Sequence, residues 1–142
     1  MKKLILIILC VITLHVRAQQ KSDVVDFNKH KIVMQFTDSD SLSQASVTGQ
    51  VKNIRAAWPN ADIEVVCHGP GLDLLIATKS KASKAVAEWS AQGVIFGACN
   101  NTMRRQKINK EQLLPSAQVV PSAMIELTLK QEAGWAYVKG GH

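Results

Sequence analysis

The apolar residues from Lys31 onward fall into two alternating patterns. Short continuous runs, typical of buried strands, occupy residues 31–36, 62–67, 94–99, 118–120 and 135–138. Between these runs, apolar residues recur at three- and four-residue spacing, which predicts helices over 41–58, 82–89 and 122–131. A shorter helix is predicted over 109–114, whereas residues 72–77 fit either a short helix or an extended segment.

This alternation predicts an α/β fold in which helices cover both faces of a mostly parallel sheet. Right-handed crossovers place the carboxyl ends of such strands along one edge. Polar clusters follow four of the predicted strands, namely Thr37-Asp38, Cys67-His68, Cys99-Asn100-Asn101 and Pro121-Ser122. Because α/β folds bind ligands beyond the carboxyl ends of their strands, we expect the functional site at this edge.

The first residues have the three-part pattern of a secretory signal peptide. A basic start is followed by an apolar run over 4–14 and by small residues before a predicted cut after Ala18. The pattern predicts a signal peptide at 1–18, a loose arm at 19–30, one domain at 31–142, and a periplasmic or secreted protein. The apolar run is too short for stable membrane insertion. The alternatives are an uncleaved anchor, a buried first strand, or a lipid attached to Cys10.

Cleavage would also change the charge of the protein. The 142-residue chain has 17 Lys and Arg against 11 Asp and Glu, a formal net charge of +6. Loss of Lys2, Lys3 and Arg17 leaves 14 basic residues and a net charge of +3. That charge is ordinary for a soluble domain, and no basic stripe with interleaved aromatic residues accompanies it. Nucleic acid is therefore not an expected partner.

Two cysteines, Cys67 and Cys99, remain after the predicted cleavage. In an oxidising compartment they would form a single bridge, two buried thiols, or one reactive thiol with a neighbour. A bridge requires neighbouring strands, because the two Cα atoms must lie within about 7 Å. Cys67 extends the apolar run Val65-Val66 and is more typical of a core residue. It is therefore a candidate second thiol or disulfide partner, with core packing as the simpler interpretation.

Cys99 is the preferred candidate for a nucleophile. The thiolate is the reactive form, and both backbone N–H groups of the following turn and nearby arginines would favour it. His68 comes from another strand exit and is a candidate base for this thiol, or an anion contact. The simpler alternatives are that Cys99 is a small buried apolar residue and that His68 is a turn residue bonded to the backbone.

Other polar residues near Cys99 have two interpretations each. Asn100, Asn101 and Thr102 would orient a substrate or cap the next turn, and Ser122 would do the same at the following helix. Arg104, with its neighbour Arg105, would attract an anionic substrate or belong to a solvated face. The cysteines and histidines lack the close spacing of a metal site, and the segment after Cys67 lacks the Gly-Lys-Ser/Thr element of a P-loop. No metal or cofactor is predicted.

Four segments resemble the DsrE/DsrF-like family, including its YchN-type members, in the same order along the chain. They are Val65-Val66-Cys67-His68-Gly69-Pro70-Gly71, Gly93-Val94-Ile95-Phe96-Gly97-Ala98-Cys99-Asn100-Asn101-Thr102-Met103, Val119-Val120-Pro121-Ser122-Ala123 and Gln131-Glu132-Ala133-Gly134-Trp135-Ala136-Tyr137. The resemblance covers about Lys31 to Lys139. It implies an α/β/α sandwich with a five-stranded parallel sheet, assembly into trimers or hexamers, and a link to sulfur metabolism.

In the sulfur-relay members of this family, a cysteine at such a site carries a persulfide, and the resemblance assigns that role to Cys99. It also implies a sulfur-donor or sulfur-acceptor protein as a partner. The leading hypothesis is an exported DsrE-like protein that carries sulfane sulfur or performs thiol redox chemistry through Cys99, with enzymatic turnover left open. The alternative is a small-ligand binding or oligomeric assembly module in which Cys99 is structural.

Overall fold

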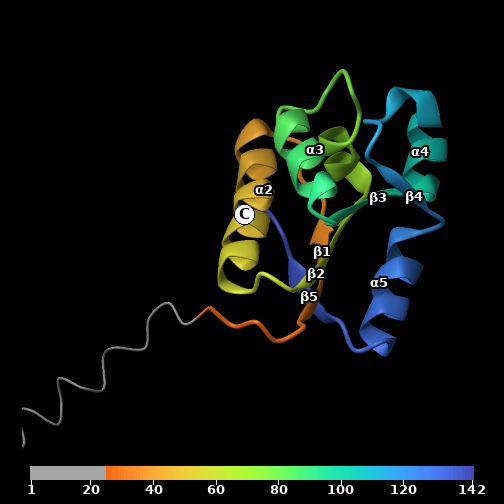
Figure 1. Cartoon of the computed structure of the whole chain (residues 1–142). Helices are drawn as coiled ribbons and strands as arrows, with labels where there is room; N and C mark the ends of the chain where they lie inside the picture. Colours follow the sequence, from red (N-terminus) through yellow and green to blue (C-terminus); the bar gives the residue numbers. More distant parts are fainter. Residues whose placement is uncertain (1–24) are drawn as a thin grey trace, which may run out of the picture.

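The computed structural model describes residues 25–142 of the chain (Figure 1). The predicted signal peptide, its cut after Ala18 and the alternative lipid site at Cys10 lie outside these residues. The described part of the predicted arm, residues 25–30, is fixed rather than loose. The Asp26 N–H donates to the Ala57 carbonyl over 2.9 Å, and the ring of His30 stacks on Trp58 at 4.1 Å.

Five strands form one sheet in the order β4-β3-β2-β1-β5. Their bounds are β1 (Lys31–Phe36), β2 (Asp62–Cys67), β3 (Ile95–Cys99), β4 (Gln118–Val120) and β5 (Ala136–Lys139). Every neighbouring pair of strands in this sheet is parallel, which confirms the predicted parallel α/β fold. The three central strands are largely buried because helices cover both their faces, whereas β5 at one edge is exposed along its length.

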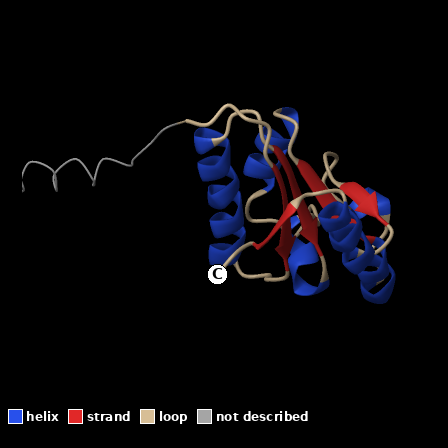
Figure 2. Cartoon of the chain, turned by 90° about the horizontal axis from the view of Figure 1, so that it is seen from below, coloured by secondary structure: helices blue, strands red, loops and turns tan. Residues whose placement is uncertain are grey.

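Helices cover both faces of the sheet, as Figure 2 shows. They are α2 (Ser41–Ala57), α3 (Ser83–Ala91), α4 (Asn100–Gln106) and α5 (Ala123–Glu132), with two 3-10 helices, η1 (Gly69–Leu74) and η2 (Lys110–Gln112). Side chains from α2, α3 and η1 pack on one face, here called the α2–α3 face. Side chains from α5 pack on the other, here called the α5 face. The fold is therefore the three-layer α/β/α sandwich that the resemblance implied.

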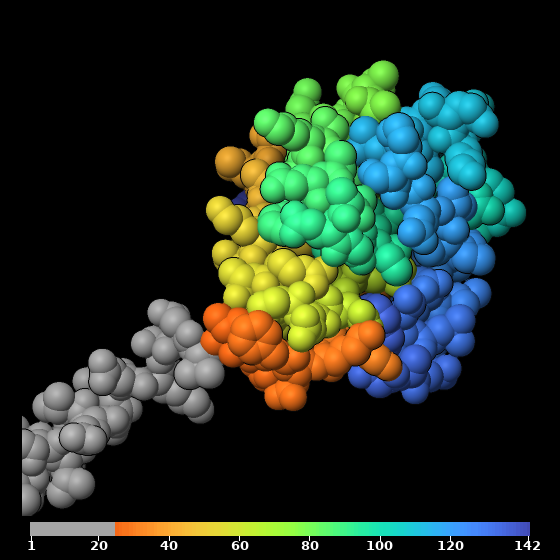
Figure 3. All heavy atoms as spheres, viewed as in Figure 1, coloured from red at the N-terminus to blue at the C-terminus, as the bar shows by residue number. Residues whose placement is uncertain are grey.

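The two faces of the sheet carry cores of different size. The α2–α3 face holds the larger cluster, in which Phe36 and Phe96 from the strands meet Val47 from α2 and Val86 from α3. The α5 face holds a smaller cluster made of Val33, Val66, Cys99, Val120, Ala123 and Leu127. Figure 3 shows the described residues as one closely packed body, with the blue α5 segment beside the orange start of β1. Cys99 thus belongs to the smaller of the two clusters.

Two local elements differ from the sequence-based expectation, and a third, left open between a short helix and an extended segment, begins as a helix. Helix α4 starts directly after Cys99, where a polar cluster and a turn were expected, and only Thr102 and Met103 within it are buried. The ambiguous segment at 72–77 contains the end of η1. The helix predicted over 109–114 shrinks to η2, because Asn109 and Gln112 form a reciprocal capping box around a single turn. No helix within residues 25–142 combines the length and hydropathy needed to cross a membrane.

Candidate functional site

Cys99 lies where β3 ends and α4 begins, at the carboxyl edge of the sheet. Its side chain faces α5, and only 4% of the residue surface is exposed. The first N–H of α5, from Ala123, donates to the Cys99 Sγ atom over 3.3 Å. The sulfur is therefore held between the starts of two helices, in the polar cluster that the sequence predicted at this strand exit.

Hydrogen bonds rather than burial decide the ionisation of Cys99. Burial alone would raise the pKa of the thiol, because the charged form loses hydration. The N–H groups of Thr102 and Ala123 act in the opposite direction, since they favour the thiolate. The Thr102 hydroxyl and the Asn101 N–H add to this effect. The net result is a Cys99 pKa below the ordinary value of a thiol, as expected for a nucleophile.

An open cavity of about 230 Å³, here called the Cys99 pocket, gives access to this sulfur. Its walls come from the ends of β2 and β3, from α4 and from the start of α5. The lining residues are His68, Cys99, Asn101, Thr102, Arg105, Ser122, Ala123 and Met124. Three of the predicted strand exits therefore contribute to one pocket, as expected for a parallel sheet.

His68 and Cys99 are cross-strand neighbours on the α5 face. Cys67 pairs with Ala98 in the register of β2 and β3, so the next residue on each strand brings His68 level with Cys99. Neighbouring strands lie about 4.8 Å apart, which places the two side chains beside each other. The His68 N–H also donates to the Phe36 carbonyl over 3.1 Å, which extends the β1–β2 ladder by one residue. The register therefore brings both residues to the Cys99 pocket, while their pairing as base and nucleophile stays a prediction.

The imidazole of His68 is held in its neutral form. Burial lowers the pKa of His68, and the positive charge of Arg105 lowers it further. The Nε2 atom of the ring lies 2.7 Å from Nε2 of Gln35 on β1. The His68 ring is thus hydrogen-bonded to a side-chain amide. The sequence analysis offered a base, an anion contact or a turn residue bonded to the backbone, and it did not predict this partner.

The turn after His68 is fixed by backbone contacts that only glycine permits. A Cβ atom on Gly71 would lie 2.4 Å from the Phe36 carbonyl oxygen, so the chain passes too close to β1 for any side chain. Helix α4 also holds Gly69 through both of its backbone polar groups. The Gly69 N–H donates to Thr102 Oγ1 over 3.1 Å, and its carbonyl accepts from Gln106 Nε2 over 3.0 Å. The turn that carries His68 is therefore locked to the helix that follows Cys99.

The structure separates the remaining predicted site residues into two groups. Asn101, Thr102 and Ser122 line the Cys99 pocket, and the Ser122 side chain makes no capping hydrogen bond to α5. Asn100 starts α4 and is absent from the pocket lining, and Arg104 instead donates to the Asn101 side chain. The cation in the pocket is Arg105. Choosing between two adjacent arginines required the helical rotation of α4, which the sequence analysis did not predict.

Cys67 lies on the opposite side of the sheet from Cys99. It is fully buried in the α2–α3 face, whereas Cys99 belongs to the α5 face, and both are free thiols. The proposed Cys67–Cys99 bridge is therefore wrong for this fold: although the strands are neighbours, the thiols point apart. Burial strongly raises the pKa of Cys67. Among residues 25–142, no group of three or more His, Cys, Asp or Glu side chains could hold a metal ion.

A buried ion pair beneath α5 was missed by the sequence analysis. Glu64 on β2 is 1% exposed, and its carboxylate meets Lys130 Nζ of α5 at 2.5 Å. The same ammonium lies 4.3 Å from the centre of the Trp135 ring. The signal was Glu64, an acidic residue between the apolar residues Ile63 and Val65 of β2. This pair ties the last turn of α5 to the sheet, and the first residue of α5 supplies the Ala123 N–H to Cys99.

Comparisons with known proteins agree with this architecture. A model described as the DsrE/DsrF-like family matches residues 29–139. A solved structure of MTH1491 from Methanobacterium thermoautotrophicum, a protein of unknown function, is 31% identical with a TM-score of 0.74, and the match covers 78% of this chain and 98% of that one. BT1422 from Bacteroides thetaiotaomicron, also of unknown function, shares the fold at 15% identity and a TM-score of 0.51, over 77% of this chain and 93% of that one. No curated protein matches the chain.

Proposed function

Because this chain belongs to the DsrE/DsrF-like family, we propose that it is an exported sulfur carrier that holds sulfane sulfur as a persulfide on Cys99. The observation that carries the proposal is the hydrogen-bonded sulfur in an open pocket. A buried thiol without donors has a raised pKa, as Cys67 has, whereas the pKa of Cys99 is lowered. Cys99 therefore has the thiolate character that nucleophilic attack on sulfur requires.

The proposed cycle consists of two thiol–persulfide exchanges without net oxidation. The Cys99 thiolate attacks the outer sulfur of a donor persulfide, a new S–S bond forms at Cys99, and the donor leaves as a thiolate. An acceptor thiolate then attacks the outer sulfur on Cys99. The S–S bond to Cys99 breaks, and the Cys99 thiolate is regenerated. The donors from Ala123 and Thr102 suit this chemistry, because they stabilise the negative charge on the sulfur both before attack and after release.

Export would expose Cys99 to an oxidising compartment. The position of Cys67 decides whether an intramolecular disulfide could consume the Cys99 thiol there. The chain has three cysteines, and Cys10 would leave with the signal peptide. Cys67 would then be the remaining partner within one chain, and it lies across the sheet in the larger core. An intramolecular bridge would require the sheet to open. This separation supports a thiol that stays available to an external donor or acceptor.

The proposal is tested by loading the purified protein with a low-molecular-weight persulfide and measuring the intact mass. We expect one added sulfur atom, located at Cys99 by peptide mapping, and its loss when an acceptor thiol is added. Cys99→Ser should not load. Cys67→Ser is the matched control, because it removes a buried thiol from the other face, and it should load like the wild type. Rapid alkylation of the folded protein should likewise modify Cys99 and leave Cys67 unmodified.

A Cys99 that reacts only after unfolding, or that never gains a sulfur atom, would contradict the carrier role. It would favour the second candidate function, an oligomeric assembly module with a structural Cys99.

One observation supports assembly independently of the chemistry. Three large apolar side chains on α5, those of Met124, Ile125 and Leu129, are between 52% and 57% exposed. Exposed apolar patches of this kind mark interfaces between proteins.

We propose that α5 contributes to a homo-oligomer, for which the family resemblance suggests a trimer or hexamer. Light scattering at micromolar concentration should return a multiple of the chain mass. Ile125→Asp should reduce that mass, because it places a charge in the apolar patch on α5. Leu42→Asp on α2 is the matched control, since Leu42 is 72% exposed outside this patch, and it should not change the mass. A monomer mass for the wild type would contradict the assembly.

Export itself is a proposal that rests on the first 18 residues. Expression of the full chain in a bacterium followed by fractionation should place the protein outside the cytoplasm. The intact mass should correspond to a chain that starts at Gln19. A lipid-modified peptide containing Cys10 would show the lipoprotein alternative, and an uncut chain in the cytoplasm would contradict export.

A further inference from the structure

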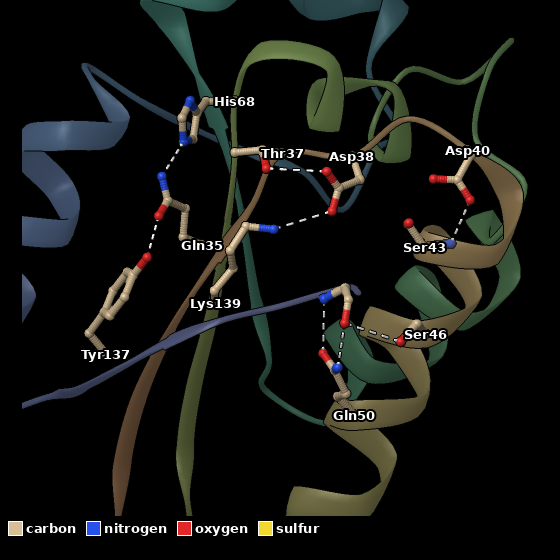
Figure 4. A network of polar contacts seen from close by, with 11 residues as sticks. Gln35, Thr37, Asp38, Asp40, Ser43, Ser46, Gln50, His68, Tyr137 and Lys139 are labelled. Carbon is tan, nitrogen blue, oxygen red and sulfur yellow. Dashed lines mark hydrogen bonds and ion pairs between the residues drawn. The ribbon is translucent and has the colours of Figure 1, made fainter.

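Figure 4 shows a row of three hydrogen-bonded side chains that ends at His68, which lines the Cys99 pocket. The Tyr137 hydroxyl on β5 donates to Oε1 of Gln35 on β1. The Gln35 Nε2 group then meets Nε2 of His68, which follows β2, at 2.7 Å. Because the strands are parallel and in register, these side chains and Cys99 occupy successive strands on the same face.

This row determines which nitrogen of His68 carries the proton. The Tyr137 hydroxyl donates to the carbonyl oxygen of the Gln35 side-chain amide, so the N–H groups of that amide face the imidazole of His68. An N–H group directed at Nε2 needs a lone pair there, and a neutral imidazole then carries its proton on Nδ1. In Figure 4 the Nδ1 atom points away from Gln35. Within residues 25–142, no hydrogen bond is formed to Nδ1.

We propose that Gln35, oriented by Tyr137, is a positioning residue that fixes His68 as the Nδ1–H tautomer, so that His68 donates a hydrogen bond to a negatively charged sulfur bound at Cys99. The inference rests on the proposed function for the identity of that bound sulfur, but the tautomer itself does not. It also changes the role expected from the sequence. With Nε2 occupied and Nδ1 protonated, His68 is a donor in the pocket and not the base that deprotonates Cys99.

The groups around His68 are consistent with a neutral donor. Arg105 lies in the same pocket, and its charge disfavours a second cation at His68. Cys99, one strand away, supplies the negative charge that a donor would face. Lys139 and Asp38, drawn with Gln35 in Figure 4, form an ion pair whose charged atoms lie 3.4 Å apart and offset each other. The sulfur itself already accepts from Ala123, so a donor from His68 would serve the outer sulfur of a persulfide.

The tautomer is measured directly by NMR of the protein labelled with ¹⁵N in histidine. Correlations between the ring nitrogens and carbon-bound protons distinguish Nδ1–H, Nε2–H and the imidazolium ion. We expect His68 to show the Nδ1–H pattern in the wild type at neutral pH. His30 is an internal reference, because its Nε2 pairs with Asp26 at 2.9 Å in another part of the molecule. An Nε2–H pattern for His68 in the wild type would overturn the proposal.

Two substitutions at Gln35 provide the sharper test. Gln35→Glu replaces the donor by a carboxylate that can only accept, so His68 should switch to a proton on Nε2 and titrate at higher pH. Gln35→Met has a similar shape without polar atoms and should release the ring to a mixture of tautomers. Neither should change the His30 spectrum. A His68 pattern in both variants identical to that of the wild type would show that Gln35 does not set the tautomer.

Tyr137→Phe tests the far end of the row. Because the Tyr137 side chain is 43% exposed, this substitution does not disturb the packing of the core. Without the hydroxyl, the amide can rotate, and the Nε2–H form of His68 should appear alongside the Nδ1–H form. Loading of Cys99 from a donor persulfide should slow in Gln35→Met by up to about fivefold, the limit set by complete loss of one hydrogen bond of about 1 kcal/mol. If Cys99 never carries sulfur, loading fails in every variant while the spectra still decide the tautomer. The two proposals therefore fail separately.

Discussion

The hydroxyl of Thr102 should control how readily Cys99 ionises, and Thr102→Val removes that hydroxyl with little change of shape. Thr102 is 3% exposed and lies in the first turn of α4. Its Oγ1 atom accepts from the Gly69 N–H over 3.1 Å, and its hydroxyl favours the thiolate of Cys99. The side chain therefore links the turn that carries His68 to the sulfur.

The size of the effect follows from the hydrogen bond that is lost. A hydrogen bond to a charged group contributes about 1.5–3 kcal/mol. The lower end applies here, because the N–H groups of Ala123, Thr102 and Asn101 remain to stabilise the thiolate. A loss of about 1.4 kcal/mol reduces the thiolate fraction roughly tenfold at a pH below the thiol pKa. Since the thiolate is the reacting species, alkylation of Thr102→Val should be about tenfold slower there.

The assay is the rate of iodoacetamide alkylation of the folded protein as a function of pH, followed by mass spectrometry of the Cys99 peptide. The wild type and Thr102→Val should differ at neutral pH and converge at a pH high enough to ionise both thiols. Convergence separates a change in ionisation from a change in access to the pocket. Thr102→Ser keeps the hydroxyl and should react nearly as the wild type does.

The matched control is Thr128→Val, which removes a threonine hydroxyl that donates to the Met124 carbonyl on the exposed side of α5. It should leave the alkylation profile unchanged. Thr102→Val should also lower the free energy of unfolding by about 1–3 kcal/mol, because the Gly69 N–H loses its acceptor in a buried place. If Thr102→Val stays folded and alkylates with the wild-type profile, the Thr102 hydroxyl does not tune the ionisation of Cys99.

Three further predictions concern stability, each measured by urea unfolding. Lys130→Met should lower the free energy of unfolding by about 3 kcal/mol, because it leaves Glu64 buried without its cation. Adding Glu64→Gln to this variant should recover much of the loss. A Lys130→Met variant as stable as the wild type would contradict this role for the pair. Gly71→Ala should cost about 3 kcal/mol, because its Cβ would meet the Phe36 carbonyl at 2.4 Å. Gly49→Ala, in open space on α2, should instead raise stability by about 0.5–1 kcal/mol, and equal effects at the two glycines would refute the steric argument. Burial raises the pKa of Glu64 above its ordinary 4.5, so the folded state keeps this proton longer than the unfolded state. Its contribution to stability should therefore decline as pH rises from about 4.5 through the folded pKa, and the slope should be absent in Glu64→Gln.

Most of the fold could be predicted from the sequence, because the strands of a doubly covered parallel sheet are continuous apolar runs. The five predicted runs became β1 to β5, and α2, α3 and α5 followed the spacing of their apolar residues. Helix α4 could not be found in this way. It is seven residues long and buries only Thr102 and Met103, so it has no apolar stripe to detect. Its formation depends on the strand before it and on the contacts that fix the turn at Gly69.

Part of the candidate site could also be predicted from the sequence. Topology alone brings the strand exits to one edge, which is why His68, Cys99 and Ser122 meet in one pocket. The partners Gln35 and Tyr137 were not foreseen. Each is a polar residue that stands among apolar neighbours in its strand, which was the available signal. Linking them to His68 required the strand order β2-β1-β5, and strand order is set by packing between distant segments rather than by local pattern.

The two cysteines show how strongly the register of the strands determines the chemistry. Cys67 and Cys99 end neighbouring strands, but Cys67 pairs with Ala98, and this offset of one residue sends the two thiols to opposite faces. One thiol is surrounded by apolar side chains that raise its pKa, and the other by N–H and hydroxyl donors that lower it. In alkaline solution the two effects oppose each other, because ionisation of Cys99 stabilises the folded chain while the need to ionise Cys67 destabilises it. The donors that distinguish Cys99 come from α4 and α5, so its lowered pKa depends on both helices being in place around the end of β3.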